Sequence, residues 1–249
     1  MNPITQFENE RNERIERLGQ DLAFQKQSLE WLEQSMRKQY VYNFSWLGRP
    51  IIQNPIDMIA MQEIIWNVQP DLIIETGIAH GGSILFSSSL LELNAACGGN
   101  PDATVIGIDI DIRSHNREAI LQHPMSKRIV LLEGSSVSSE VVSKVHELAQ
   151  GKKKVLVFLD SNHTHEHVLA ELNAYAPLVS KDSYCVVFDT FVEDVPADVF
   201  DNRPWKPGDN PKTAVHAYLR DHPEFEIDKA MQNKLQITVA PDGFLRRIS

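Results

Sequence analysis

Carboxylates and an imidazole gather behind apolar runs in the second half of the chain. Asp160 follows the run Val155–Leu159, Asp189 follows Cys185–Phe188, and His163 stands three residues after Asp160. Carboxylates at neighbouring strand ends can bind one hard cation such as Mg²⁺, and an imidazole with a pKa of about 6.5 can remove a proton from a hydroxyl at neutral pH. We therefore expect a metal site at Asp160 and Asp189, and catalytic roles for Asp160 and His163, with His163 as the general base.

Other roles stay open for these residues. Three histidines, His163, His165 and His167, follow Asp160 closely, and on a helix that starts near residue 163 the first and third would share a face. His163 and His167 could then bind a transition metal such as zinc together with Asp160, or His163 could only cap the helix. Asp160 and Asp189 could likewise cap a helix and a turn.

A glycine-rich turn behind another apolar run predicts a cofactor cradle. The run Leu72–Ile74 is typical of a strand buried on both faces of a parallel sheet. Glycines let a ligand approach the backbone, and the helix that follows would direct its free N–H groups at that ligand. Packing alone is the other reading of such glycines. The residues expected to line the cradle are Glu75, Gly77, Ala79, Gly81 and Ser83.

The next two strand ends extend this cofactor site. Asp109 and Asp111 end the second apolar run, where an acid can accept both hydroxyls of a ribose, and Asp109 is the better candidate because Asp111 could cap a helix. The third run ends in a small polar turn with Gly134 and Ser135, which could hold an adenine edge or cap the next helix. Three successive strand ends thus supply a cradle, a ribose acid and an adenine turn.

The spacing of the glycines selects among adenosine cofactors. The stretch Gly77–Gly82 lacks both the Gly-x-Gly-x-x-Gly spacing of dinucleotide enzymes and the Gly-Lys-Ser/Thr ending of a phosphate-binding loop. S-adenosylmethionine, which has no phosphates, is therefore the expected cofactor, and Glu75 with the turn would hold its methionine portion. An oxidoreductase that uses NAD is disfavoured by the same spacing.

The elements that must position these residues alternate along the chain. Alternation of strands and helices predicts an α/β fold with a doubly wound, mostly parallel sheet of seven strands, whose ligands lie at the carboxyl ends of the strands. Strands are expected at 71–75, 104–109, 129–132, 154–160, 184–189, 225–228 and 234–239. Helices are expected at 56–68, 83–94, 138–149, 163–176 and 212–221.

The two ends of this pattern suggest additional parts. Residues 1–45 form a helical arm, because an apolar stripe runs through 8–39, and the stripe could pack on the protein's own body or on a second subunit. Residues 40–55 combine aromatics and prolines in a way that resists regular structure. Residues 46–249 are expected to form the cofactor-binding domain, with the proline-rich stretch 192–212 as a lid.

Composition excludes several classes of function. The chain has 249 residues, is 42% hydrophobic and carries a formal net charge of -10, so it can bury one α/β core and lacks the basic face that binds nucleic acid. Its two cysteines give neither a disulfide framework nor a cysteine zinc site. Because no run reaches the length of a membrane span and the amino terminus lacks an apolar signal core, a cytoplasmic location is expected.

Several blocks of the chain together resemble the cephalosporin hydroxylase family. The resemblance covers about residues 46–247. It implies a class I S-adenosylmethionine-dependent methyltransferase, related to metal-dependent O-methyltransferases of sugars and natural products, and it includes members found with glycan and lipopolysaccharide synthesis. The blocks that carry it are Trp46–Pro50, Glu75–Ser83, Gly107–Arg113, Leu159–Val168, Ala174–Val179 and Gly243–Arg247.

One departure from the family bears on the metal. The family closes its fifth strand with a Glu-Asp pair, whereas this chain has Phe188-Asp189. Water or another side chain could complete the metal's shell, or the enzyme could work without metal, or the protein could bind cofactor without activity. The side chains that could substitute are Asn162, Thr190, Glu193 and Asp194.

The expected function follows from the residues and the resemblance. We expect methyl transfer from S-adenosylmethionine to a hydroxyl of a sugar, a glycoconjugate such as lipopolysaccharide, or a natural product, assisted by Mg²⁺. The acceptor would be a small molecule or a glycan, and the arm could join subunits into a homo-oligomer. The alternative is a catalytically silent scaffold that binds the cofactor within a glycan-assembly complex.

Overall fold

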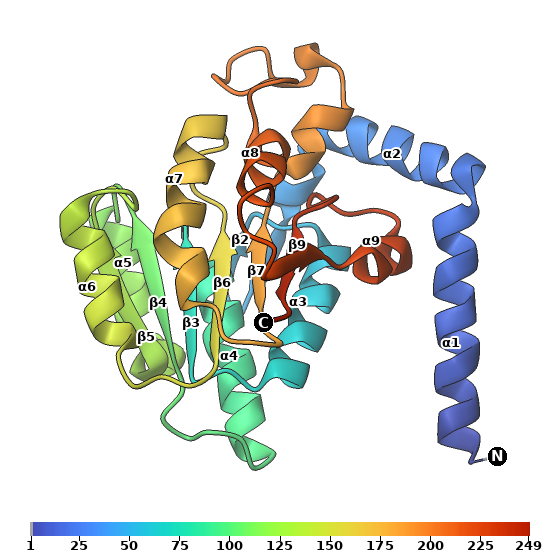
Figure 1. Cartoon of the computed structure of the whole chain (residues 1–249). Helices are drawn as coiled ribbons and strands as arrows, with labels where there is room; N and C mark the ends of the chain where they lie inside the picture. Colours follow the sequence, from blue (N-terminus) through green and yellow to red (C-terminus); the bar gives the residue numbers. More distant parts are fainter. Residues whose placement is uncertain (1) are drawn as a thin grey trace.

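The computed structural model describes residues 2–249 and centres on one mixed sheet (Figure 1). The strands of this sheet are β3 (Leu72–Thr76), β4 (Thr104–Asp109), β5 (Ile129–Glu133), β6 (Val155–Leu159), β7 (Tyr184–Val187), β8 (Phe225–Ile227) and β9 (Phe244–Arg247). Their order is β5-β4-β3-β6-β7-β9-β8, and only β9 runs in the direction opposite to that of the other strands. The expected sheet of seven mostly parallel strands is confirmed.

Helices cover both faces of the sheet, as doubly wound folds require. One face carries α3 (Pro55–Val68), α4 (Gly82–Ala96) and α5 (Ser114–Leu121), and the other carries α6 (Ser139–Ala149), α7 (His165–Tyr175) and α8 (Pro211–Tyr218). Successive strand residues point to opposite faces. Ile73 therefore packs in the core beneath α3 and α4, while Leu72 and Ile74 pack in the core beneath α6, α7 and α8.

The centre of the sheet is the point where the strand order reverses. The chain passes from β3 outward through β4 to β5, and then returns to place β6 on the other side of β3. Such a switch point opens a crevice at the carboxyl ends of the two central strands. Any ligand site of this fold is expected there, beyond Thr76 and Leu159.

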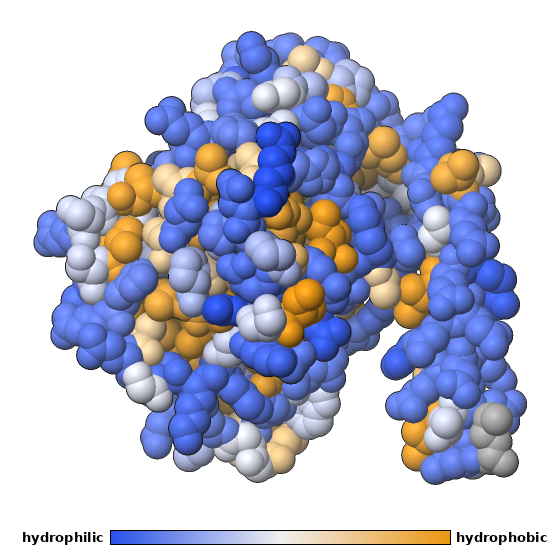
Figure 2. Space-filling view, viewed as in Figure 1, coloured by the Kyte–Doolittle hydropathy of each residue, from blue (hydrophilic) through white to orange (hydrophobic). Residues whose placement is uncertain are grey.

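The arm consists of two helices that differ in their contacts. α1 (Pro3–Gln20) and α2 (Leu22–Arg37) meet at Asp21, whose side chain accepts a hydrogen bond from the Phe24 backbone N–H (3.0 Å) and so starts a new helix. α2 packs against the rest of the same chain, because its Leu32 is buried in the core on the α3 and α4 side of the sheet. Every residue of α1 is exposed or half-buried. The carboxyl end of α1 contacts the body, where the Gln236 side-chain amide donates to the Leu18 carbonyl (3.3 Å), whereas its amino-terminal part stands apart from the body (Figure 2).

Residues 40–55, expected to lack regular structure, contain a short hairpin. A 3-10 turn, η1 (Tyr40–Asn43), leads into β1 (Phe44–Trp46), which pairs antiparallel with β2 (Arg49–Ile51). The expectation was wrong because Leu47 and Gly48 both take positive φ angles (46° and 85°), the backbone of a two-residue hairpin turn.

Two further expectations need correction. The sequence patterns did not indicate α5, whose only large apolar residues are Ile120 and Leu121. The strand expected at 234–239 is absent from the described structure: α9 (Lys229–Leu235) occupies its first part, and β9 is the strand that pairs with β7. The backbone N–H of Val239 donates to the buried Asp57 carboxylate (2.9 Å) and is thereby satisfied without a strand partner.

The proline-rich stretch 192–212 lies above the carboxyl ends of the strands (Figure 1). It contains the end of η4 (Thr190–Asp194), a second 3-10 turn, η5 (Ala197–Phe200), and the start of α8. Among residues 2–249, no helix combines the length and the apolar character that crossing a membrane requires.

Candidate active site

The turn between β3 and α4 brings bare backbone to the switch point. Gly77 and Gly81 take positive φ angles of 81° and 87°, and a Cβ atom on Gly77 would collide with the backbone of Asp160. Glycine is therefore required where β3 meets the end of β6. Gly81 has no side chain to cap α4, so the first N–H groups of that helix remain free for a ligand.

Asp109 holds this turn from the end of β4. Its Oδ2 atom accepts hydrogen bonds from the backbone N–H groups of Ile78 (3.1 Å) and Ala79 (3.0 Å), and its Oδ1 atom accepts one from Asp111 (3.2 Å). Asp109 also lines the main cavity, whereas the Asp111 side chain is 69% exposed outside that lining. Asp109 thus has a structural role that the sequence pattern did not show, since it shapes the cradle itself.

The carboxyl group of Glu75 lies beneath the turn instead of in the main cavity. It is buried, accepts a hydrogen bond from the Ser87 hydroxyl (3.0 Å), and shares a narrow void with Gln53, Ser83 and Asp160. Burial raises the pKa of Glu75 to about 7, although the hydrogen bond from Ser87 opposes this shift. Its Oε1 atom is unpartnered within residues 2–249.

Asp160, His163 and Asp189 meet at the carboxyl ends of β6 and β7. One ligand atom from each lies within 4.8 Å of the other two, and His163 Nε2 is 3.0 Å from Asp189 Oδ2. Gln53 Nε2 donates to Asp160 Oδ2 (2.8 Å). Burial, reinforced by the nearby charges of Asp189 and Glu75, raises the pKa of Asp160 well above its usual value. A divalent cation would relieve this repulsion, so the donor set fits one.

Asp189 adopts a backbone conformation that non-glycine residues seldom take. Its φ angle is 56°, in the left-handed region, and it precedes η4 without forming a side-chain cap there. The helix that follows Asp160 is likewise preceded by Thr164 as its N-cap residue. The geometry places both carboxylates toward His163, and the capping alternative is not what the structure shows.

The alternative in which His163 pairs with His167 is not what the structure shows. α7 begins at His165, two residues later than expected, so His163 lies before the helix and shares no helical face with His167. His167 Nε2 approaches the hydroxyls of Ser136 (3.0 Å) and Ser161 (3.2 Å) instead. A zinc site built from both histidines and Asp160 is therefore not formed by this arrangement.

The residues considered as substitutes for the missing acid are engaged elsewhere. Phe188 itself is 2% exposed and its ring packs against Phe158, with the centroids 6.1 Å apart. The Thr190 hydroxyl donates to the Pro241 carbonyl, and the Glu193 carboxylate accepts from the Gly208 N–H. Asp194 forms an ion pair with Lys212, and the Asn162 side chain accepts from the Thr164 N–H. Within residues 2–249, the cluster thus comprises two carboxylates and one imidazole.

The expected adenine turn lies beside the main cavity and not in its lining. Gly134 follows β5, and its backbone N–H donates to the Asp109 carbonyl (2.9 Å), which ties this turn to the end of β4. Ser138 caps α6 by accepting a hydrogen bond from Val141 (3.3 Å), so Ser135 is free of that role.

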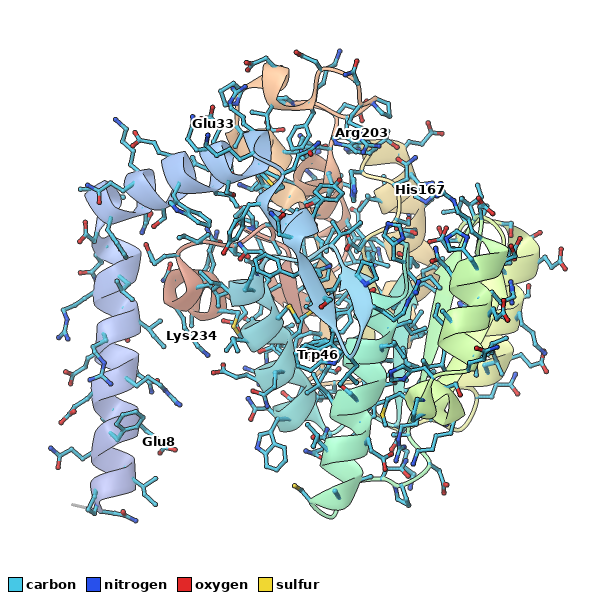
Figure 3. All side chains as sticks on the ribbon, turned by 180° about the vertical axis from the view of Figure 1, so that it is seen from behind. Glu8, Glu33, Trp46, His167, Arg203 and Lys234 are labelled. Carbon is cyan, nitrogen blue, oxygen red and sulfur yellow. The ribbon has the colours of Figure 1, made fainter. Side chains whose placement is uncertain are left out.

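A cavity of about 820 Å³ joins these residues to the arm and to the 192–212 stretch. Trp205 stands at the border, with its ring edge-on to His163 and the ring centroids 4.6 Å apart. Arg37 on α2 forks onto the two carboxylate oxygens of Asp198 (3.0 and 3.1 Å), so the two segments are joined beside the cavity. In Figure 3, Glu33 on α2 and Arg203 lie at this same end of the molecule. The cavity residues from the two segments include Met36, Gln39, Tyr42, Phe200, Arg203 and Trp205.

Sequence reasoning missed two residues of the site. Gln53 bonds directly to Asp160, yet it stands in a segment without periodicity that could have indicated its role. Arg37 lies at the end of the arm's apolar stripe, where a charged residue is ordinary, and its partner Asp198 is 161 residues away.

The strand order and the helices on both faces of the sheet define a class I methyltransferase fold, whose switch point carries the Gly77 turn. A family model described as rhamnosyl O-methyltransferase/CmcI matches residues 38–248, and the chain belongs to this family. The resemblance to the cephalosporin hydroxylase family is thereby confirmed, and the protein is assigned to the methyltransferases.

Individual relatives agree with this assignment. The rhamnosyl O-methyltransferase of Mycobacterium leprae is 28% identical over 225 residues, which cover 87% of this chain and 90% of that one. That of Mycobacterium tuberculosis (strain H37Rv) is 28% identical over 222 residues, which cover 84% and 82%.

Solved structures show the same fold at lower identity. CmcI with Mg and SAM matches with a TM-score of 0.58 and 19% identity, covering 84% of this chain and 78% of that one. CalS11, a TDP-rhamnose 3'-O-methyltransferase, matches with a TM-score of 0.51 and 19% identity, covering 82% and 89%.

Proposed function

We propose that the protein transfers the methyl group of S-adenosylmethionine to a hydroxyl of a sugar, on a glycoconjugate such as lipopolysaccharide or on a natural product, with the help of a divalent cation such as Mg²⁺. One observation carries this proposal: a single cavity joins the Gly77 turn to the cluster of Asp160, His163 and Asp189. The rhamnosyl O-methyltransferases among its relatives, and the Mg and SAM of CmcI, support the same chemistry.

The methyl donor would lie along the Gly77 turn. The bare backbone at Gly77 and the free N–H groups of α4 suit the methionine portion, while Asp109 shapes the turn and is placed to meet the ribose. Glu75 supports the turn from below through Ser87. The complete set that we assign to the cofactor is Glu75, Gly77, Ala79, Gly81, Ser83, Asp109, Asp111, Gly134, Ser135 and Asp160.

Asp160 and Asp189 would hold the cation, which when bound lowers the pKa of an acceptor hydroxyl. His163 accepts the proton of that hydroxyl, and the Asp189 carboxylate, 3.0 Å from His163 Nε2, orients and stabilises the resulting imidazolium. The acceptor oxygen then bonds to the methyl carbon as the carbon–sulfur bond breaks. For this in-line displacement the protein must hold the oxygen about 3 Å from the methyl group.

The acceptor would occupy the part of the cavity between the arm and the 192–212 stretch. Trp205 offers an aromatic surface beside His163, which suits the apolar face of a sugar ring.

We propose that 192–212 acts as a lid over this space, that residues 1–45 are the arm, and that residues 46–249 are the methyltransferase domain. Met36 and Tyr42 in the cavity lining support a contribution of the arm to the acceptor site.

The cellular setting that we propose is a reducing cytoplasm, since Cys97 and Cys185 are both free. A homo-oligomer would use α1, because α2 already packs on its own body while Ile4 and Phe7 on α1 are 68% and 59% exposed.

The decisive experiment measures S-adenosylhomocysteine formation from S-adenosylmethionine, Mg²⁺ and rhamnosyl acceptors. Acceptors that lack one ring hydroxyl at a time would locate the methylated position, and the O-methyl product would be identified by mass spectrometry. Methylation of a sugar hydroxyl supports the proposal. Calorimetric binding of S-adenosylhomocysteine without any methylated product would favour the silent scaffold, which Phe188 in place of the family's acid suggests. Binding of NAD instead would overturn both.

A further inference from the structure

A buried polar network lies on the α7 side of the sheet, outside the cluster that carries the proposed chemistry. Glu171 on α7 is fully buried (0% exposed), and its Oε1 atom accepts hydrogen bonds from the hydroxyls of Ser136 (2.5 Å) and Ser161 (2.6 Å). His167, one helical turn earlier, approaches the same two hydroxyls through Nε2. Figure 3 shows His167 on α7, on the side toward α5 and α6.

The network joins two turns that the sheet itself separates. Ser136 follows β5 and Ser161 follows β6, and in the sheet β4 and β3 lie between these strands. A single carboxylate oxygen of Glu171 therefore ties together backbone segments that share no strand pairing. Tyr175, also on α7, strengthens this link because its hydroxyl donates to the Ser136 carbonyl.

Burying such a polar network under a helix costs more free energy than filling the same space with apolar side chains. A buried carboxylate is stabilised only by the groups that bond to it, and Glu171 Oε2 is unpartnered in the part of the chain that the structure describes. The imidazole of His167 is 3.4 Å from Glu171 Oε1. What these groups supply, and an apolar side chain would not, is a fixed separation of the two turns.

These turns flank the strand end that carries Asp109. The Gly134 N–H donates to the Asp109 carbonyl on one side (2.9 Å), and Ser161 lines the main cavity on the other. The space between them is where the order of strand ends places the adenosine portion of the methyl donor. A shift of the Ser136 turn would change the width of that space while leaving in place Asp160 and His163, which stand on either side of Ser161 in the other turn.

We propose that Glu171, assisted by His167, is a positioning residue for the adenosine portion of the methyl donor, an inference that rests on the proposed function. Glu171 touches neither the reacting atoms nor the acceptor. It sets the separation of the Ser136 and Ser161 turns, and through them the fit of the adenine and ribose.

The test compares Glu171→Gln with wild type by calorimetry, using S-adenosylhomocysteine and free adenosine as probes. Loss of the buried charge-assisted hydrogen bonds should weaken both probes about tenfold or more. The KM for S-adenosylmethionine should rise, while kcat at saturating donor and the KM for the acceptor stay within about twofold. Glu166→Gln, an exposed position on the same helix, is the matched control and should bind both probes like wild type.

A second variant covers the case in which Glu171→Gln does not fold. Ser136→Ala removes one donor to Glu171 without emptying the space under α7, and it should weaken adenosine binding to a smaller degree. In the double variant the two losses should not add, because both act through one network. Unchanged probe binding in Ser136→Ala and Glu171→Gln would overturn the inference alone, as would an equal fall in donor affinity, kcat and melting temperature. Wild-type protein that binds no S-adenosylhomocysteine would instead overturn the proposed function as well.

Discussion

The two halves of the cavity differ in what lines them: one is formed mainly by main-chain atoms and the other by side chains. The half that we assign to the cofactor is main chain at strand ends, where Gly77 contacts the Asp160 backbone and Asp109 accepts hydrogen bonds from the turn. The half that we assign to the acceptor consists of side chains from the arm and from 192–212, joined beside the cavity by Arg37 and Asp198. Strand register determines the first half, whereas the second depends on contacts between distant segments. Donor binding should therefore tolerate little change, and acceptor choice should be the property that substitutions can alter.

Metal removal should have the largest effect, because the cluster of Asp160, His163 and Asp189 stands where the halves meet. We expect excess EDTA to abolish turnover, since the two carboxylates then repel each other and the acceptor hydroxyl keeps its ordinary pKa. Binding of S-adenosylhomocysteine to the Gly77 turn should persist in calorimetry. Re-addition of Mg²⁺ is the control for specific chelation.

Full turnover in EDTA would contradict this prediction. Phe188 places an aromatic ring where the family has an acid, and full turnover in EDTA would mean that this replacement has abolished metal binding at the site. The two carboxylates would then act on substrate orientation alone. If EDTA also abolishes donor binding, the cation would be part of the cofactor half and not of the border between the halves.

His163→Ala should come next in size. Removal of the proton acceptor is expected to lower kcat by roughly 10²–10⁴-fold, with donor and metal affinity nearly unchanged. The matched control is His165→Ala, because His165 Nδ1 contacts Thr213 (2.8 Å) and belongs to neither half of the cavity. A variant that loses metal affinity would show that His163 is a ligand, and a rate within a few-fold of wild type would show that it is not the base.

Much of the fold could be predicted because buried strands leave a recognisable pattern of apolar residues in the local sequence. Leu72–Ile74 and Val155–Leu159 are continuous apolar runs, as central strands buried on both faces must be. The strand expected at 234–239 failed for the opposite reason: the Val239 backbone is satisfied by the Asp57 side chain, a long-range contact without a local signal. The hairpin at 44–51 was missed because its turn depends on Leu47 in a conformation that its residue type does not indicate.

The site divides in the same way. Asp109, Asp160 and Asp189 follow apolar runs directly, and Gly77 follows one after two residues. The carboxyl edge of a parallel sheet therefore had to bring them together. The relation of His163 to His167 depended on where α7 begins, and helix boundaries are poorly determined by sequence. Gln53 reaches Asp160 from a segment 107 residues away. Only the folded structure could show that contact.

Asp109→Ala tests the cofactor half directly. The variant loses the acceptor for the Ile78 and Ala79 N–H groups and any contact with ribose, so donor affinity should fall by about 1.5–3 kcal/mol, roughly tenfold to more than a hundredfold. Titration calorimetry with S-adenosylhomocysteine measures this. Asp111→Ala sharpens the result, because Asp111 does not hold the turn. A larger loss in Asp111→Ala would make that exposed residue the ribose acid and leave Asp109 with the turn alone.

Arg37→Ala should give the smallest effect, and it tests the acceptor half. Arg37 donates to both oxygens of Asp198 and also to Glu33, and the fork lowers the pKa of Asp198 below its usual value. Exposed ion pairs are weak and screened by salt. We therefore expect a rise of only about twofold to fivefold in the KM for the acceptor, smaller at high salt, with no change in donor affinity.

Charge reversal decides whether this pair joins the two segments or merely sits on the surface. Arg37→Asp should raise the acceptor KM further than Arg37→Ala, and adding Asp198→Arg should restore part of the loss, because the pair is then rebuilt with its polarity exchanged. Arg246→Ala breaks the comparable exposed pair with Asp182 and should leave acceptor binding unchanged. If the double reversal is no better than Arg37→Asp alone, the pair does not hold the acceptor half together. Cavity residues such as Tyr42 and Trp205 would then have to keep their places through apolar packing.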